Sequence, residues 1–166
     1  MDKEVNQIIE NFDLKPHPEG GYYRENYRSN INIAEKNLPE NFSGRRSLAT
    51  SILFLLPKGS FSSFHKLKQD EIWYFHAGEG PILHCIAPDH TYTKYKMGSG
   101  INRNEVPQLT IPAGTFFAAE TTKKFSFSGC MVTPGFDFAD FDMPTAAQLI
   151  KLFPEHEELI RRFTRS

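Results

Sequence analysis

The feature that most constrains this chain is a long succession of short β-prone stretches separated by turn signals. From Gly21 onward, stretches rich in Phe, Tyr, Thr, Ile and Ser alternate with punctuation such as Pro57-Lys58-Gly59 and Pro112-Ala113-Gly114. Many short strands at this spacing are typical of a β-sandwich or a closed β-barrel and not of βαβ units. The predicted strands cover residues 21–27, 47–56, 61–66, 71–77, 82–87, 92–96, 106–111, 115–120 and 125–132.

Both ends of the chain are predicted to be helical. Apolar residues from Val5 to Phe12 recur at helical spacing, which predicts a helix over residues 3–12. A second apolar stripe runs from Ala146 to Phe153, and together with the segment after Pro154 it predicts helices within 145–163. We expect these helices to pack on the outside of the barrel. No repeat divides the chain, so we predict a single domain, 1–166, with a barrel core over 21–142.

Composition and charge argue against several classes of partner. The net charge is -1 and Lys and Arg are dispersed, so nucleic acid is not an expected partner. The longest apolar run, 52–56, is too short to span a membrane, and residues 1–12 lack the features of a signal peptide. Cys85 and Cys130 lie far apart without a CxxC motif, which favours buried thiols over a disulfide. We therefore predict a cytoplasmic protein.

The stretch from Gly59 to Gly78 contains the residues best suited to chemistry. Side chains alternate along a strand, so two predicted inward faces follow: Phe61, Ser63, His65 and Leu67 on one strand, and Glu71, Trp73 and Phe75 on the next. If both faces point inward, His65 and Glu71 meet inside the barrel beside Trp73. An imidazole, a carboxylate and an aromatic wall in an apolar cavity form a credible ligand site.

This stretch resembles the first cupin motif. Its glycine, histidine, glutamate and closing glycine positions are occupied by Gly59, His65, Glu71 and Gly78. Leu67 occupies the position of the second histidine. The second cupin motif is recognisable at Pro112 and Gly114, with Phe117 in place of its histidine.

Three further segments narrow the resemblance: 16–25 (PHPEGGYYRE), 70–73 (DEIW) and 129–138, which runs from Gly-Cys to Pro-Gly-Phe-Asp-Phe. Together they are similar to a small cupin subfamily catalogued as a domain of unknown function. That resemblance implies an all-β jelly roll (a double-stranded β-helix), usually dimeric, with a pocket. The segment 21–25 also resembles, more distantly, a strand of the dTDP-sugar epimerases.

The resemblance gives three alternatives for the site. Cupin metals are typically held by three His and one Glu, but here only the remnant ligand positions His65 and Glu71 keep donor side chains. Two ligands hold a divalent ion poorly, so no cofactor is expected and a divalent metal is the minor alternative. His76 alternates to the face opposite Glu71, and His84 is not oriented by the sequence.

Metal-independent acid–base chemistry is the second alternative. A histidine beside a carboxylate is a sound general base, and in the epimerases a tyrosine is the acid. His65 and Glu71 would be catalytic here, with Tyr23 as the leading acid and Tyr74 or Tyr95 as alternatives. The epimerase Asp-x-Arg is replaced by Glu19-Gly20, so a nucleotide phosphate would need Arg24, Arg28, Arg45 or Arg46 instead.

Non-catalytic binding is the third alternative, because Trp73 offers a flat face on which a sugar ring stacks. The expected ligand-binding residues are Trp73, Ser63, Arg24, Phe117 and Phe75. We expect His17 to be a loop or strand-start residue and 136–142 to be an exposed edge with apolar anchors. We therefore predict a homodimeric cupin that binds a small molecule, with a sugar or sugar derivative as the leading class. Isomerase or epimerase activity on that molecule is the further prediction. The homodimer is expected to form by N-terminal strands that extend the partner's sheet.

Overall fold

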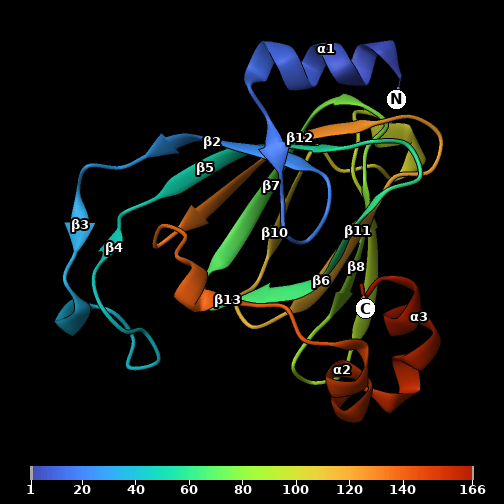
Figure 1. Cartoon of the computed structure of the whole chain (residues 1–166). Helices are drawn as coiled ribbons and strands as arrows, with labels where there is room; N and C mark the ends of the chain where they lie inside the picture. Colours follow the sequence, from blue (N-terminus) through green and yellow to red (C-terminus); the bar gives the residue numbers. More distant parts are fainter. Residues whose placement is uncertain (1, 166) are drawn as a thin grey trace.

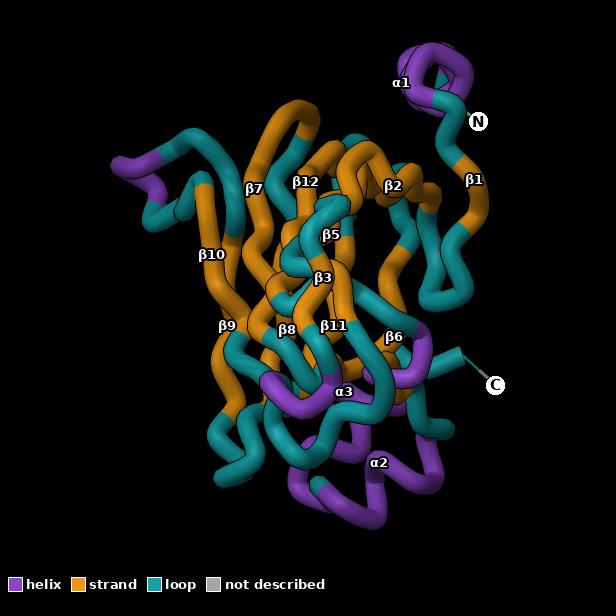
Figure 2. Tube along the Cα trace, turned by 90° about the vertical axis from the view of Figure 1, so that its left-hand side faces the viewer, coloured by secondary structure: helices purple, strands orange, loops and turns teal. Residues whose placement is uncertain are grey.

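Two antiparallel sheets face one another and enclose the core in this computed structural model, which describes residues 2–165 (Figures 1 and 2). The first sheet has the order β1 (Lys15–Pro16), β2 (Tyr22–Arg28), β5 (Thr50–Leu56), β12 (Ser126–Thr133), β7 (Asp70–Gly78) and β10 (Gln108–Ile111). The second has the order β13 (Phe141–Asp142), β6 (Phe61–Leu67), β11 (Phe116–Glu120), β8 (Ile82–Ile86) and β9 (Tyr92–Lys96). A separate ribbon of β3 (Asn32–Ile33) and β4 (Arg46–Ser47) projects to one side in Figure 1.

The main core lies between the two sheets. Phe54, Trp73 and Cys130 come from the first sheet, and Leu83 and Phe117 come from the second. Because strand side chains alternate, every second residue of each central strand enters this core. Burying these large side chains in contact with one another provides the main hydrophobic stabilisation of the barrel.

The helices cover the outer faces of the sheets, as the sequence predicts. Helix α1 (Lys3–Phe12) begins with Asp2, whose side chain accepts from Glu4 N at 3.1 Å, and it packs Val5 on the first sheet. Helices α2 (Ala146–Leu152) and α3 (Glu157–Arg162) bury Leu149 and Ile160 on the second sheet. Figure 1 shows α1 beside the first sheet, near β2 and β12, and α2 and α3 beside the second sheet. The 3₁₀ turns are η1 (Glu35–Asn37), η2 (Ile101–Arg103), η3 (Phe138–Asp140) and η4 (Pro154–His156).

The predicted strands and the observed ones agree closely, with three differences. The short strands β1, β3 and β13 were not predicted, because two residues carry no periodic signal. The predicted strand 47–56 is divided into β4 and β5. Strand β2, which we expected to be unpaired within the chain, pairs with β1 and β5; the extension of a partner's sheet by N-terminal strands stays a prediction.

A break in register on β6 corrects the predicted alternation. His65 pairs with Phe117 and Ser62 pairs with Ala119, so one extra residue of β6 lies between these pairs. A bulge of this kind reverses the faces on its two sides. Phe61 therefore packs with the outer cluster under the C-terminal helices, while His65 faces the interior.

Candidate functional site

A cavity of about 420 Å³ opens between the sheets at the end where β7 begins. Strands β2, β5, β6, β7 and β12 line it, together with the turn after β1 and the segment 136–141. Its size suits a small molecule. The lining residues that matter below are His17, Glu19, Tyr23, Glu25, Arg28, Phe54, His65, Leu67, Glu71, Trp73, Cys130, Phe136, Asp137, Phe138 and Phe141.

A tight turn at Gly20-Gly21 brings His17 and Glu19, which the sequence did not assign to the site, into this cavity. Both glycines have positive φ, 117° and 73°, and a Cβ on Gly21 would lie 2.6 Å from the Leu55 carbonyl. Only glycine tolerates this combination of backbone angle and close approach. The turn places Glu19 against β6, where its carbonyl accepts from Ser63 N at 2.8 Å and its side chain enters the pocket.

His65 is fixed by two contacts within the pocket. Its Nδ1 lies 2.7 Å from the Ser63 carbonyl, which can only accept, so Nδ1 carries a proton. Its Nε2 lies 3.2 Å from Oε2 of Glu19. In a neutral ring this Nε2 has only a lone pair, and so the contact requires a proton shared between His65 and Glu19.

Burial determines where that proton resides. His65 is 2 % exposed, and burial lowers its pKa, an effect that Glu71 partly offsets. Burial also raises the pKa of Glu19, against smaller opposite effects of His17 and other neighbours. Both shifts favour the uncharged forms. They act toward a neutral imidazole whose Nε2 accepts a hydrogen bond from the carboxyl group of Glu19.

His17 is the second histidine of the pocket. Glu19 N lies 3.3 Å from its Nδ1 and donates to it, and its ring packs edge-on against Tyr23 with centroids 4.5 Å apart. Burial lowers the pKa of His17, while Glu19 raises it and His65 lowers it further. With Nδ1 occupied as an acceptor, the neutral ring carries its proton on Nε2.

Glu71 is the second buried carboxyl group. It is 7 % exposed, and burial raises its pKa to about 7; His65 and the adjacent Cys130 and Trp73 oppose this rise, and Glu19 adds to it. A carboxyl group with this pKa changes its protonation state near neutral pH. The predicted proximity of His65, Glu71 and Trp73 is thus observed, and all three line the cavity together with Tyr23.

Four of the expected ligand-binding residues, Arg24, Ser63, Phe117 and Phe75, lie outside the cavity lining, whereas Arg28 lies in it. Arg24 is exposed and donates to the Phe12 carbonyl at 3.2 Å, so it reaches toward α1 and away from the pocket. Ser63 is buried and contacts His65 only through its carbonyl. Phe117 and Phe75 pack in the core behind the pocket, with the Phe117 ring 4.2 Å from the His65 ring. Of the three candidate tyrosines, Tyr23 is the one in the lining.

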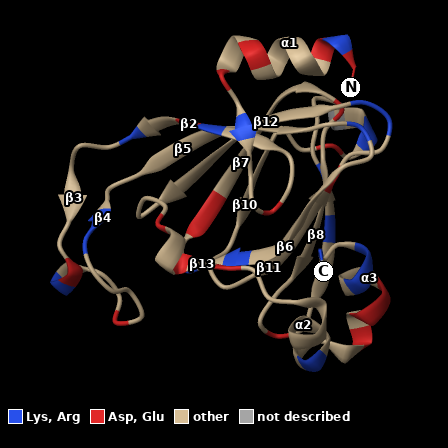
Figure 3. Ribbon diagram, viewed as in Figure 1, with Lys and Arg blue, Asp and Glu red and all other residues tan. Residues whose placement is uncertain are grey.

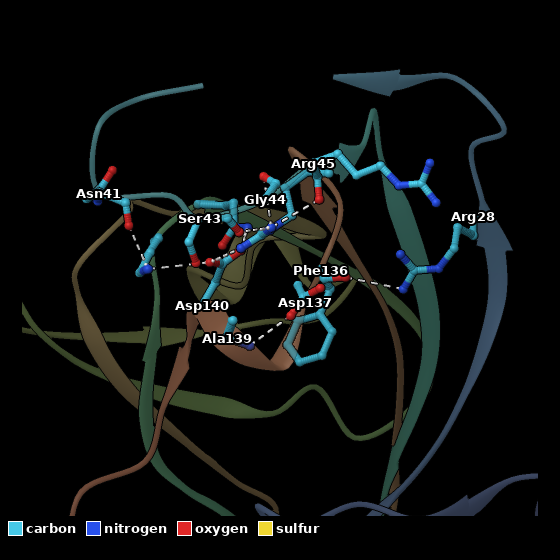
Figure 4. A network of polar contacts seen from close by, with 12 residues as sticks. Arg28, Asn41, Ser43, Gly44, Arg45, Phe136, Asp137, Ala139 and Asp140 are labelled. Atoms are coloured by element: carbon cyan, nitrogen blue, oxygen red, sulfur yellow. Dashed lines mark hydrogen bonds and ion pairs between the residues drawn. The ribbon is translucent and has the colours of Figure 1, made fainter. Parts of the chain in front are cut away.

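The mouth of the pocket is formed by the segment 136–141, which we had expected to be an exposed edge. Phe136, Phe138 and Phe141 line the cavity, although Phe138 is also 58 % exposed. Arg28 donates to the Phe136 carbonyl at 3.2 Å, and Asp137 caps the following turn by accepting from Ala139 N (Figure 4). The alternation of aromatic and acidic residues in this segment was visible in the sequence. It does not specify whether the aromatic side chains face a cavity or the solvent.

A buried ion pair holds this segment in place. Arg46 donates from Nε and Nη2 to the two carboxylate oxygens of Asp140, both at 2.7 Å. Gln69 donates to the same carboxylate at 2.6 Å. A two-pronged pair of this geometry fixes orientation as well as distance. Strand β4, which contains Arg46, is therefore tied to the mouth of the pocket.

The residues present do not fit a cupin metal. Of the four motif positions, Leu67 lines the cavity as an alkyl group and Phe117 presents its ring to His65. Across residues 2–165, no group of three or more His, Cys, Asp or Glu side chains has a geometry that could hold a metal ion. The nitrogen of His65 that faces the cavity is already engaged by Glu19. No helix in this described part of the chain is long and apolar enough to cross a membrane.

The two facing sheets with an internal pocket define a cupin barrel. The chain belongs to the family described as Cupin superfamily (DUF985), whose pattern matches residues 6–144. An uncharacterized yeast protein, YML079W of Saccharomyces cerevisiae, is 30% identical over 147 residues, which cover 82% of this chain and 73% of that protein.

Solved structures of similar chains agree with this fold. A hypothetical protein from Leishmania major has a TM-score of 0.88 and 34% identity, covering 97% of this chain and 98% of that one. Protein SO0799 from Shewanella oneidensis has a TM-score of 0.85 and 37% identity, covering 96% of each chain. Oxalate decarboxylase of Bacillus subtilis has a TM-score of 0.56 and 15% identity over 90% of this chain and 37% of its own, a likeness of fold alone.

Proposed function

We propose that this protein binds a small polar molecule, with a sugar or sugar derivative as the leading class, and transfers protons on it without a metal. The observation that carries this proposal is the pairing of two proton-holding groups in one cavity. His65 and Glu19 share a proton across 3.2 Å, and Glu71 has a pKa of about 7. One group donates a proton while the other accepts one, which is the chemistry of an isomerase or epimerase.

The walls of the cavity support a ring-shaped ligand. Trp73 and Phe54 pack edge-to-face with centroids 5.6 Å apart, and Tyr23 adds a hydroxyl group to the same lining. Aromatic faces stack on the apolar face of a sugar ring, while carboxyl and imidazole groups bond its hydroxyls. In this proposal Glu19 is the acid that donates a proton to the ligand, and Tyr23 is the alternative donor.

The experiment is a thermal-shift screen of sugars and sugar derivatives, followed by proton NMR of each hit in D₂O with the protein. An isomerase or epimerase exchanges a carbon-bound proton of the ligand for deuterium, and His65→Gln abolishes that exchange. His90→Gln is the matched control, because His90 is an exposed turn residue outside the cavity. A ligand that binds without exchange would favour the second candidate, a non-catalytic binding module. The absence of any hit that depends on His65 or Trp73 would overturn both.

A homodimer remains part of the proposal, with a different surface from the one first expected. Tyr27, Ile31 and Leu48 are large apolar residues that are 53%, 64% and 42% exposed on and beside the β3–β4 ribbon. A second copy is a natural cover for such residues. Light scattering coupled to gel filtration tests this, with Ile31→Asp expected to shift a dimer toward the monomer mass.

A further inference from the structure

Carboxyl groups outnumber cationic groups in the lining of the pocket. Among the described lining residues, four are acidic and one, Arg28, is a permanent cation. Arg28 is already held by Glu25, to which Nε and Nη2 donate at 2.8 Å and 2.7 Å. Figure 3 shows acidic segments on β7 and beside β13 at this end of the barrel. Once the Arg28–Glu25 pair is set aside, the remaining acidic residues are Glu19, Glu71 and Asp137.

Glu71 is the acidic residue that most needs a partner. Its side chain is more than nine-tenths buried, lines the cavity, and makes no ion pair with a Lys or Arg within residues 2–165. A buried carboxylate without a counter-charge is costly, so a ligand that supplies one is stabilised there. The two pocket histidines do not supply it, because burial lowers the pKa of each.

The rest of the lining is suited to an organic cation. Six aromatic side chains surround the cavity, from β2, β5, β7 and the segment 136–141: Tyr23, Phe54, Trp73, Phe136, Phe138 and Phe141. Aromatic faces attract ammonium groups through their quadrupoles, and the attraction is stronger where water is excluded. The same lining repels a phosphate or carboxylate, because no unpaired Lys or Arg of the described lining is present to receive it.

We propose that this pocket selects small organic cations, amines or quaternary ammonium compounds, over neutral and anionic molecules of the same shape. This inference rests on the proposed function, because it concerns the same cavity and names its ligand class. An amino sugar is a sugar derivative that satisfies both the proposed function and the preference for cations. Glu71 pairs with the cation, the aromatic side chains enclose it, and Glu19 with His65 remains available for proton transfer.

The test uses probes of similar shape and different charge. Choline, 3,3-dimethylbutan-1-ol and 3,3-dimethylbutanoate share one shape and carry a positive, zero and negative charge. Glucosamine and glucose form the corresponding sugar pair and are compared at pH 7, where Glu71 is partly ionised. By calorimetric titration we expect each cation to bind at least about tenfold more tightly than its neutral counterpart, and the anion to bind most weakly.

Two variants and a pH series identify the residue responsible. Glu71→Gln keeps the shape of the side chain and should remove the preference for choline, whereas Glu10→Gln, on the exposed face of α1, should leave it unchanged. Choline affinity should rise between pH 6 and pH 8 as Glu71 ionises. The charge of choline is constant over this range, so the change reports on the protein. The titratable groups facing Glu71 are His65 on β6, Glu19 in the turn after β1 and Cys130 on β12.

The outcomes separate this inference from the proposed function. Equal affinity for choline and its neutral analogue, tighter binding of the anion, or no binding of any of the five probes would overturn the inference. A preference for cations without deuterium exchange would uphold the inference and count against the isomerase. Deuterium exchange into a neutral sugar that binds as tightly as the corresponding amino sugar would support the isomerase and overturn the inference.

Discussion

Oε2 of Glu19 lies 3.2 Å from Nε2 of His65, and Nδ1 of the same ring is held 2.7 Å from the Ser63 carbonyl. This relationship assigns the carboxylate partner of His65 to Glu19, a residue that precedes the barrel strands. The sequence pointed to Glu71 for that role. Glu71 is instead a separate proton-holding group on the opposite sheet, so the site combines two carboxyl groups with the imidazoles of His65 and His17.

The first prediction concerns Glu19. In Glu19→Gln the amide can still donate to His65 Nε2, so folding and ligand binding should persist, but no proton can be passed on. We expect deuterium exchange into a bound substrate to fall about a hundredfold, a typical contribution of one acid–base group. The rate is measured by NMR in D₂O beside Glu10→Gln. An unchanged rate in Glu19→Gln would remove Glu19 from the mechanism.

The second prediction concerns stability and pH. Glu71 has a folded-state pKa of about 7 against an ordinary value of 4.5, so the folded protein binds more protons than the unfolded chain between these values. The free energy of unfolding therefore contains a contribution that falls as pH rises through this window, by about 3 kcal/mol in full.

His17 and His65 have lowered pKa values and change stability in the opposite direction. The contribution of Glu71 is therefore isolated as the difference between Glu71→Gln and the wild type in urea unfolding. We expect the variant to gain relative stability from pH 5 to pH 8. A difference that stays constant over this range would contradict the raised pKa.

The third prediction concerns metal binding. Leu67 and Phe117 occupy the positions where cupins carry histidines, and Phe117 packs its ring 4.2 Å from His65. Replacing both, as Leu67→His with Phe117→His, should restore a four-donor set and raise affinity for Mn²⁺ or Ni²⁺ by at least about tenfold. Titration calorimetry measures the gain, with Leu67→Asn and Phe117→Asn as the matched control. Stoichiometric metal in the purified wild type would contradict our interpretation of these positions.

The fourth prediction concerns the mouth of the pocket. Asp140→Ala would leave the Arg46 guanidinium buried without its carboxylate, and removing one partner of a buried pair costs about 3–5 kcal/mol. Chemical denaturation should show a loss of this order, since both side chains are at most 3% exposed. Replacing the pair together, as Arg46→Met with Asp140→Leu, should recover most of it. Equal losses in the single and double variants would mean that the ion pair is not the cause.

Much of the fold could be predicted from local patterns. The helix over residues 3–12, the strand succession and the outward position of the C-terminal helices follow from periodicity and turn residues, which act within a few neighbours. The proximity of His65, Glu71 and Trp73 also followed, because side-chain alternation and motif spacing are local properties. The face on which Phe61 lies could not be predicted in this way, since a bulge depends on how two strands are registered.

The sequence by itself determined a cupin barrel whose usual metal positions are partly apolar, because that information lies in residue identity and spacing. Only the tertiary structure decided that His17 and Glu19 enter the pocket, that Arg24 leaves it, and that 136–141 closes its mouth. The physical reason is that these placements depend on a tight turn at Gly20-Gly21 and on contacts between segments distant in the chain. Burial, which sets the protonation of Glu19 and Glu71, is likewise a property of the assembled barrel alone.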